Sequence, residues 1–326
     1  MSETKDIVFA VDSTMYDTRS DPQRLVYEDL DTLLAENLQH HFSGLICARR
    51  WLDVCADPEY GHQELVAFFA DHMPEFISRL RDDGASRRGF SLISLGPGDG
   101  AVDHHILRHL DRAVPVASYC GFDFSFELLC VAMQRIGVAG SYRQRFPKRA
   151  VCGDLNAGDG CAWAGADDGT VRLLSLTGFT LGNFAEGALL SRIRSWMRPG
   201  DCLLLDARTH EFGRVGGQAA RVRGPSTRTL SSYTSPANNR FAFGPLEVAT
   251  CATVDDVTIG WEMKRTMTKV PNAINIVVHC ADLDTKMRFT GRPLRRDRVE
   301  LATTTLYRYE DLAGWLIESG FTVIHT

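Results

Sequence analysis

Apolar and polar residues follow different patterns in three parts of the chain. From about residue 23 to 84, leucines such as Leu30, Leu34 and Leu38 recur at helical spacing. From 89 to 206, short apolar runs alternate with amphipathic segments. Beyond 245 the residues alternate in the manner of β-strands. The pattern therefore predicts a helical region, a sheet with crossover helices and an antiparallel lobe.

The middle part predicts strands and helices in alternation. Its strands are apolar almost throughout, as in Cys202-Leu-Leu-Leu, which suits a parallel sheet buried on both faces. We expect an α/β doubly wound sheet. The expected strands are 90–95, 116–122, 149–153, 170–176 and 202–206, and the expected helices are 101–111, 125–136 and 185–197.

The flanking segments are less regular. Residues 1–20 suggest a loosely held arm, and residues 207–240 suggest a long mobile connection, with a lid as one interpretation. The later elements are expected as strands at 247–254, 257–268, 273–281, 285–290, 298–307 and 321–325, and a helix at 310–319. These elements predict four domains or segments, at 1–85, 86–210, 211–305 and 306–326.

Composition excludes several classes of protein. The net charge of −5 argues against a general nucleic-acid binder, and no apolar run approaches the length of a membrane span. The nine cysteines stand singly without a Cys-x-x-Cys pair, so we expect neither a metal site nor a disulfide framework. The amino terminus has no signal-peptide pattern, and we expect a cytoplasmic protein.

Three glycines follow the first predicted strand of the sheet. Gly96-Pro-Gly98-Asp-Gly100 lets a ligand approach the backbone, and the next helix begins directly after it. Asp123 ends the second strand, where a carboxylate can bind ribose hydroxyls, and Asp154 after the third strand can accept from an exocyclic amine. The G-x-G-x-G spacing favours a nucleoside ligand such as S-adenosylmethionine (SAM) over NAD. The alternatives are a tight connection at the glycines, helix capping by Asp123 and a simple turn at Asp154.

A loop of small polar residues, Leu176-Thr-Gly-Phe-Thr-Leu-Gly-Asn183, follows the fourth strand of the sheet. Ligands of doubly wound sheets lie beyond the carboxyl ends of the strands, so this loop is the expected meeting place of substrate and methyl donor. The amide of Asn183 can hold an amino or carboxylate group, or it can cap the next helix. The arginines around 292–298 suggest a solvated turn, and the pairs His40-His41 and His104-His105 do not face a common site.

At Gly178-Phe-Thr-Leu-Gly-Asn183 the chain resembles the "G-S-T-I-G-N" loop of the histidine-specific methyltransferase family of ergothioneine biosynthesis. The resemblance runs from about residue 55 to the end. Its other pieces are Asp57-Pro-Glu-Tyr60 for "P-E-Y-Y", Leu95-Gly-Pro-Gly for "L-G-S-G", Phe122-Asp-Phe-Ser for "F-D-V-S", Met197-Arg-Pro-Gly-Asp for a helix-to-strand turn, and Tyr309-Glu-Asp-Leu onward for the last helix and strand.

The resemblance implies a class I methyltransferase fold, Rossmann-like, in which Asn183 holds the amino-acid part of the substrate and Tyr60 lines its pocket. Two departures separate this chain from the family pattern. The second tyrosine and the Thr-Arg pair of "P-E-Y-Y-x-T-R" are missing, and the acid of "E-x-S-x-K-F" falls on Thr304, with Leu306 in place of serine. We therefore do not expect histidine as the substrate, whereas the motifs of the cofactor-binding part are retained.

We therefore expect a SAM-dependent N-methyltransferase of a small amine in specialised metabolism, with a free amino acid as substrate, arginine and tryptophan-type amino acids among the options. A guanidinium substrate would need acids around it, and the candidates are Glu59, Asp206, Glu211 and Glu262. Two alternatives remain: a small-molecule O-methyltransferase using His210 as base, and a non-catalytic subunit of the same fold.

The candidate site residues fall into two groups. The substrate and catalytic candidates are Asn183, Tyr60, Asp206 and Thr180, and the cofactor candidates are Gly96, Gly98, Gly100, Asp123, Ser125, Asp154, Leu155 and Thr177. Sheets of this class usually close with an antiparallel strand after a segment such as 321–326. Either the protein was trimmed or another segment supplies that strand.

Overall fold

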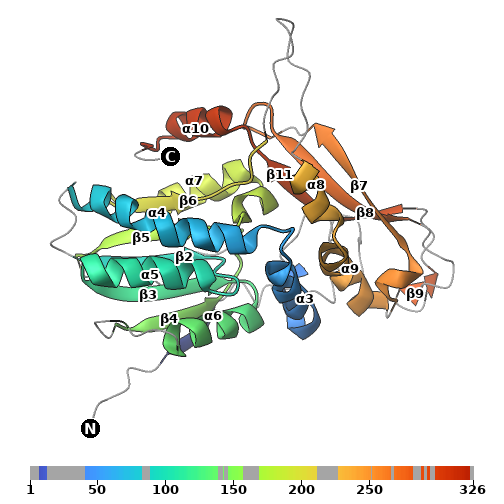
Figure 1. Ribbon diagram of the computed structural model, residues 1–326, viewed down its shortest axis with the longest axis horizontal. Coiled ribbons are helices and arrows are strands. Elements are labelled where there is room, and N and C mark those ends of the chain that lie inside the picture. Colours follow the sequence, from blue (N-terminus) through green and yellow to red (C-terminus); the bar gives the residue numbers. More distant parts are fainter. Residues whose placement is uncertain are drawn as a thin grey trace, which may run out of the picture. The chain divides into compact units, whose positions relative to one another are not determined.

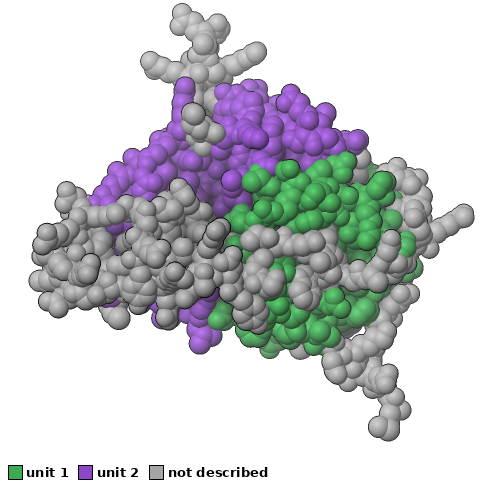
Figure 2. Space-filling view, turned by 180° about the vertical axis from the view of Figure 1, so that it is seen from behind, with its two compact units in different colours: residues 1–20, 62–180, 188–206 green, residues 21–61, 181–187, 207–326 purple. Residues whose placement is uncertain are grey.

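The computed structural model describes residues 7–12, 41–82, 89–138, 142, 146–156, 169–210, 227–250, 252–265, 268–281, 288–289, 292–293 and 298–323. Among the residues named above, Leu30, Leu34, Leu38, His40 and Glu211 lie outside these ranges. By their contacts the residues form two compact units, coloured separately in Figure 2. Unit 1 comprises 1–20, 62–180 and 188–206, and unit 2 comprises 21–61, 181–187 and 207–326. The four segments expected from the sequence stay a prediction.

Unit 1 contains a parallel sheet of six strands in the order β1-β4-β3-β2-β5-β6. The strand order changes direction around β2, so the sheet is doubly wound, as predicted. All six residues of β2 are buried, which shows that both faces of the sheet are covered. Its strands are β1 (Val8–Val11), β2 (Phe90–Leu95), β3 (Val116–Asp123), β4 (Lys148–Cys152), β5 (Val171–Leu176) and β6 (Cys202–Leu205).

Helices connect these strands. α4 (His62–Asp82) and α5 (Ala101–Ala113) run side by side along the sheet (Figure 1), and α6 (Phe126–Val138) packs on β3 and β4. All three helices share one apolar core with β2 and β3, in which Leu107, Leu129 and Phe90 are fully buried. α7 (Glu186–Trp196) follows β5. The predicted strands and helices of this part are therefore confirmed to within about two residues, an agreement typical of strongly periodic segments.

The arm expected at 1–20 contains a strand that the sequence did not reveal. β1 pairs in parallel with β4, and the N–H of Asp12 donates to the carbonyl of Cys152 at 2.7 Å. The strand has four residues at the sheet edge, and Val8 and Val11 are about half exposed. Its residues form a short apolar run, but the run stands apart from the alternating strands and helices that marked the rest of the sheet.

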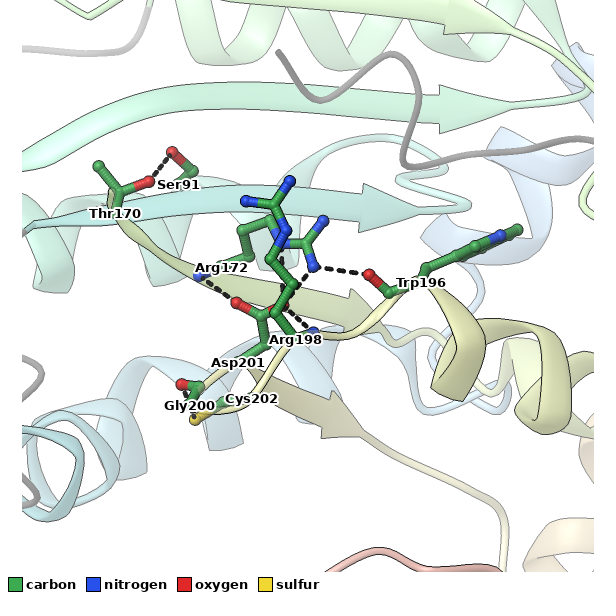
Figure 3. Close-up of polar contacts among 8 residues, drawn as sticks. All are labelled: Ser91, Thr170, Arg172, Trp196, Arg198, Gly200, Asp201 and Cys202. Atoms are coloured by element: carbon green, nitrogen blue, oxygen red, sulfur yellow. Dashed lines mark hydrogen bonds and ion pairs between the residues drawn. The ribbon is translucent and has the colours of Figure 1, made fainter. Parts of the chain in front are cut away.

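A buried ion pair fixes the turn that leads into β6 (Figure 3). The guanidinium of Arg172 binds the carboxylate of Asp201 and donates to the carbonyl of Trp196 at 2.6 Å. Asp201 also accepts the N–H of Arg172 at 3.0 Å and the N–H of Arg198 at 2.7 Å. Because this pair lies before the amino end of β6, it supports the sheet at the end opposite to the glycine turn.

Unit 2 contains a three-stranded antiparallel sheet of order β11-β8-β7, as expected for the lobe. Its strands are β7 (Thr258–Arg265), β8 (Ile274–Ala281) and β11 (Arg298–Leu306), and α10 (Tyr309–Glu318) follows. Two short strands, β9 (Arg288–Phe289) and β10 (Arg292–Pro293), pair separately. α3 (Gly44–Ala56) packs on α9 (Pro236–Thr250), and α8 (Thr227–Thr234) packs on β7 (Figure 1).

Two expectations for unit 2 were wrong. The segment 207–240, expected as a connection, includes α8 and the start of α9, and the strand expected at 247–254 falls largely in α9. Phe243 and Leu246 of α9 are fully buried against the antiparallel sheet. Tertiary packing therefore stabilises a helix that Gly244 and Pro245 disfavour locally.

The end of the chain also differs from expectation. Residues 321–323 form no strand, and the rest of the strand expected at 321–325 lies outside the described ranges. Among the described residues, the six-stranded sheet contains no antiparallel strand, and β6 pairs with β5 alone.

Candidate functional site

The glycine turn lies at the carboxyl end of β2 in unit 1. Gly96, Gly98 and Gly100 all have positive φ angles, of 78°, 55° and 72°. A left-handed backbone disfavours any side chain, so the turn needs glycine at these positions. A Cβ on Gly100 would lie 2.8 Å from Cα of Ala132 in α6, whereas one on Gly96 would meet only Thr180, at 3.5 Å. Gly100 therefore serves helix packing, and Gly96 keeps the backbone accessible beside Thr180.

Asp99 connects the turn to two helices. Its Oδ1 accepts the N–H of Ala101 at 3.0 Å and lies 3.3 Å from Nε2 of His62, the first residue of α4. Arg135 of α6 donates to the Asp99 carbonyl at 2.8 Å and to Oδ2 at 3.0 Å. Burial alone would raise the pKa of Asp99, but the hydrogen bonds and charges of these partners hold it below its ordinary value. Asp99 thus stays ionised and fixes the shape of the turn.

Asp123 ends β3 and is buried, with 8% of its surface exposed. Burial raises its pKa to about 6, although hydrogen bonds from the N–H groups of Ser125, Gly98 and Phe124 oppose the rise. The Ser125 N–H donates to Oδ1 of Asp123 at 2.8 Å, and Ser125 Oγ accepts the N–H of Leu128 at 3.2 Å. Ser125 therefore caps α6, as expected. Asp123 lies against the glycine turn and contributes to the same cap.

The other cofactor candidates occupy local roles as well. Asp154 accepts the N–H of Asn156 at 2.7 Å, which is the turn considered as its alternative role. Leu155 is buried, and its carbonyl accepts from Arg192 at 2.7 Å. Thr177 is buried at the end of β5, and its carbonyl accepts from Thr180 Oγ1 at 2.7 Å. Whether these residues also contact the cofactor stays a prediction.

Asp206 lies after β6 and holds the start of the loop that follows β5. Its two carboxylate oxygens accept the N–H groups of Gly178, at 3.0 Å, and Phe179, at 2.8 Å. Phe179 has a φ of 63°, in the left-handed region. The loop then continues into a 3-10 helix, η5 (Thr180–Asn183).

In unit 2 the end of this loop packs on β11. Thr304 Oγ1 donates to Oδ1 of Asn183 at 3.2 Å. A Cβ on Gly182 would lie 2.6 Å from the carbonyl oxygen of Thr305 and 3.0 Å from Oγ1 of Thr304. Glycine is therefore required for the loop to approach β11 so closely. Asn183 is the last residue of η5, and α7 begins at Glu186, so Asn183 is not the N-cap of that helix.

Tyr60, also in unit 2, is part of an aromatic cluster with a cation. The guanidinium carbon of Arg208 lies 4.4 Å from the ring centroid of Tyr60 and 5.2 Å from that of Tyr233. Arg208 donates to the Tyr60 carbonyl at 2.6 Å and to Ser232 Oγ at 3.0 Å. Trp51 meets Tyr60 edge-on, with centroids 5.5 Å apart. Burial raises the pKa of Tyr60 above its ordinary value, so its hydroxyl stays protonated.

The sequence pattern did not indicate His62, Arg135 or Arg208 as parts of these arrangements. Thr304 was indicated as the position of the family's acid but not as a partner of Asn183, and Asp99 carried the signal of a common helix cap. The others come from distant parts of the chain, and their partners are set by the fold. Among the described residues, no three His, Cys, Asp or Glu side chains gather as a metal site would require, and no helix is long and apolar enough to cross a membrane.

A parallel doubly wound sheet with a glycine turn after β2 and a buried acid at the end of β3 is a nucleoside-binding arrangement, and class I SAM-dependent methyltransferases have it. Residues 48–210, half of the chain, match the model of the family of histidine-specific, SAM-dependent methyltransferases. The protein belongs to this family, as the sequence motifs indicated. It is thus a SAM-dependent methyltransferase.

Solved structures with similarity to this chain include other methyltransferases. A SAM-dependent methyltransferase from Clostridium acetobutylicum shares 11% identity over 77% of this chain and 80% of its own, with a TM-score of 0.38. DesVI of Streptomyces venezuelae shares 13% identity over 78% of this chain and 85% of its own, with a TM-score of 0.36. The sugar N-methyltransferase KedS8 of Streptoalloteichus shares 12% identity over 80% of this chain and 81% of its own, with a TM-score of 0.36. No curated protein sequence is significantly similar to the chain.

The residues of unit 1 fit the cofactor. Gly96 leaves the backbone open, and the N–H groups at the start of α5, of which Asp99 binds that of Ala101, suit a carboxylate such as that of the methionine part. The N–H groups of Ser125, Gly98 and Phe124 occupy three of the roughly four acceptor positions of the Asp123 carboxylate and leave about one. Asp123 can therefore also accept a ribose hydroxyl.

Proposed function

We propose that this methyltransferase transfers the methyl group to the nitrogen of a free amino acid or a close derivative. The observation that carries the proposal is the hydrogen bond from Thr304 to Oδ1 of Asn183. This bond uses the oxygen side of the amide, so the Nδ2 donors are the part of Asn183 that would bind a ligand. Such donors suit a carboxylate, and every free amino acid has one beside its amine.

The cluster around Tyr60 supports an anionic group in the substrate. Arg208 is always charged, and its planar guanidinium is held in place by two aromatic rings. A cation of this kind favours a carboxylate and repels a second cation nearby. The Tyr60 hydroxyl stays protonated and can donate, but it does not act as a base near neutral pH.

The described acids that were considered for a guanidinium substrate are either exposed or already bound to other groups. Glu59 is exposed, Glu262 forms ion pairs with Lys264 and Arg298, and Asp206 binds the backbone of Gly178 and Phe179. Glu211 lies outside the described residues. We therefore favour a tryptophan-type amino acid over arginine. Histidine stays disfavoured, because Thr304 replaces the acid of the family pattern.

SAM, when bound, supplies a methyl group activated by its positive sulfur. The protein's residues then have the tasks of holding the acceptor amine neutral, orienting it and excluding water. Asn183 and Tyr60 fix the amino-acid part of the substrate. Thr180, beside Gly96, lies where the loop meets the glycine turn within unit 1.

The O-methyltransferase alternative depended on His210. In the structure, Nε2 of this buried side chain lies 3.1 Å from the carbonyl of Asn272, and its backbone N–H donates to the carbonyl of Tyr307 at 2.9 Å. Burial lowers the pKa of His210, so a neutral ring donates its Nε2 proton to that carbonyl. These bonds give His210 a structural role and favour the N-methyltransferase.

The test is incubation of the protein with deuterium-labelled SAM and single amino acids, with mass spectrometry of the products. We expect label on a nitrogen of at least one amino acid with a neutral side chain, and none with the Asp123→Ala variant. Fragmentation of the product separates N- from O-methylation. Label on oxygen would contradict the proposal, and so would S-adenosylhomocysteine (SAH) binding without transfer to any amino acid or derivative.

A further inference from the structure

The turn at Gly178 and Phe179 is held by one side chain from another strand end. Both oxygens of Asp206 are used, one for each of the two consecutive N–H groups, at 3.0 and 2.8 Å. Asp206 itself is fixed by β6 and by its own N–H, which donates to the carbonyl of Leu176 at 3.3 Å. A carboxylate bound in this way determines the orientation of two successive peptide planes.

The backbone at this turn is unfavourable without such support. Gly178 and Phe179 have φ angles of 80° and 63°, so both are left-handed. Among the described residues, only Phe179 and Asn272 combine a side chain with positive φ, and asparagine tolerates that region far better. Phe179 has no polar side chain that would bond the local backbone. The strain is therefore balanced by partners elsewhere.

The turn also determines where the next element begins. Thr180 Oγ1 donates to the Thr177 carbonyl at 2.7 Å, which closes the turn, and η5 then runs directly to Asn183. A change in the two peptide planes would rotate the start of η5. Only Leu181 and Gly182 separate Thr180 from Asn183, so we infer that the amide would move with it.

We propose that Asp206 is a positioning residue. Its carboxylate holds the left-handed turn at Gly178 and Phe179 and thereby places Asn183 for the substrate. The link to substrate rests on the proposed function, whereas the link to the turn does not. This role differs from that of a proton acceptor, because both oxygens of the carboxylate bind backbone N–H groups.

The direct test is hydrogen exchange by mass spectrometry on a peptide that spans the turn. Asp206→Asn keeps the shape of the side chain but retains a single acceptor oxygen and no charge. We expect the turn amides to exchange about 10-fold faster or more. Asp255→Asn, the same change at an exposed residue of the 3-10 helix η6 (Val254–Asp256), is the matched control and should leave the turn unaffected.

A second substitution separates positioning from proton transfer. Glycine adopts positive φ without a Cβ penalty, so Phe179→Gly should restore slow exchange in the Asp206→Asn background to within about 3-fold of the wild type. On a substrate found by the labelling experiment, the same double variant should recover most of the lost kcat/KM. A lost proton acceptor cannot be restored by a backbone change.

The outcomes distinguish this proposal from the proposed function. Unchanged exchange in Asp206→Asn, or no recovery with Phe179→Gly, overturns the positioning role even if amino acids are methylated. Faster exchange with recovery supports the hold on the turn even if no amino acid is methylated. If Asp206→Asn fails to fold, Phe179→Gly alone decides. Its melting temperature should be equal to or above that of Phe179→Ala, which loses the same ring but keeps the Cβ, and a lower one contradicts the proposal.

Discussion

Asp123 is a buried carboxylate next to the glycine turn, and its charge depends on pH near neutrality. Its pKa of about 6 lies above the ordinary value of 3.8, because burial disfavours the charged form. Ribose hydroxyls donate more strongly to a carboxylate than to a neutral acid. Cofactor binding therefore favours the ionised form of Asp123.

This predicts that affinity for SAH is constant well above pH 6 and falls as the pH drops through about 6. The affinity falls at low pH because SAH binds the deprotonated form of Asp123 better. Protonation of Asp123 in the free protein therefore competes with SAH binding. Asp123→Asn should weaken binding about 10- to 100-fold at pH above the transition and remove this pH dependence. Titration calorimetry over a pH series measures both effects.

Asp103 provides a matched control. It is also buried, burial raises its pKa to about 6, and Tyr119 donates to its Oδ2 at 2.7 Å. Asparagine at 103 can still accept from Tyr119, and Asp103 lies in α5 rather than in the turn. Asp103→Asn should therefore keep the pH dependence of SAH binding. The assignment of Asp123 is contradicted if its asparagine variant has the wild-type pH profile.

The residue roles show where sequence reasoning ends. The chain order of the glycine turn and Asp123 suffices to place a nucleoside site, because both follow from strand ends of a parallel sheet. Nothing local to Asp99 or Asn183 indicates that His62, Arg135 or Thr304 would contact them. Such partners depend on the packing of elements distant in sequence.

At the scale of elements, η5 depends on Gly182. The sequence has a glycine at this position, but only the structure gives the reason for it. Gly182 approaches the carbonyl of Thr305 in β11 so closely that a Cβ would lie 2.6 Å away. Contacts shorter than 3 Å require the backbone of η5 or β11 to move. The loop that contains Asn183 is thus fitted to β11.

We predict that Gly182→Ala lowers the free energy of unfolding by about 1–3 kcal/mol, because it overpacks this contact. Gly314 lies in α10, and a Cβ there would meet nothing within 4 Å. Gly314→Ala should raise the free energy of unfolding by up to about 1 kcal/mol through helix propensity. Urea unfolding of both variants measures the difference. Equal effects in the two variants would show that η5 is not tightly fitted to β11.

Element prediction succeeded where periodicity is strong and failed where packing decides. β2 to β6 are largely apolar runs of four to eight residues that alternate with amphipathic helices, and they form as expected. β1 is an apolar run as short as β6, but it stands apart from this alternation, so nothing next to it marked it as part of the sheet. α9 contains Gly244 and Pro245, and only the burial of Phe243 and Leu246 explains why it is a helix.

At the scale of the whole molecule, the chain contains two compact units, and the candidate residues divide between them. The glycine turn, Asp123 and Asp206 belong to unit 1, and Tyr60 and Asn183 belong to unit 2. The loop from 177 to 183 passes from the first unit to the second between Thr180 and Leu181. The sequence indicated both groups of residues, but only the structure shows which contacts fix each of them.

The central claim is that Asn183 takes the amino-acid part of the substrate, while the cofactor depends on unit 1. The most direct measurement is the steady-state kinetics of Asn183→Ala on an amino acid methylated by the wild type, together with SAH calorimetry. The account predicts a KM about 10-fold higher or more, from the loss of hydrogen bonds to a charged group, with unchanged SAH affinity. An unchanged KM would remove Asn183 from the substrate site.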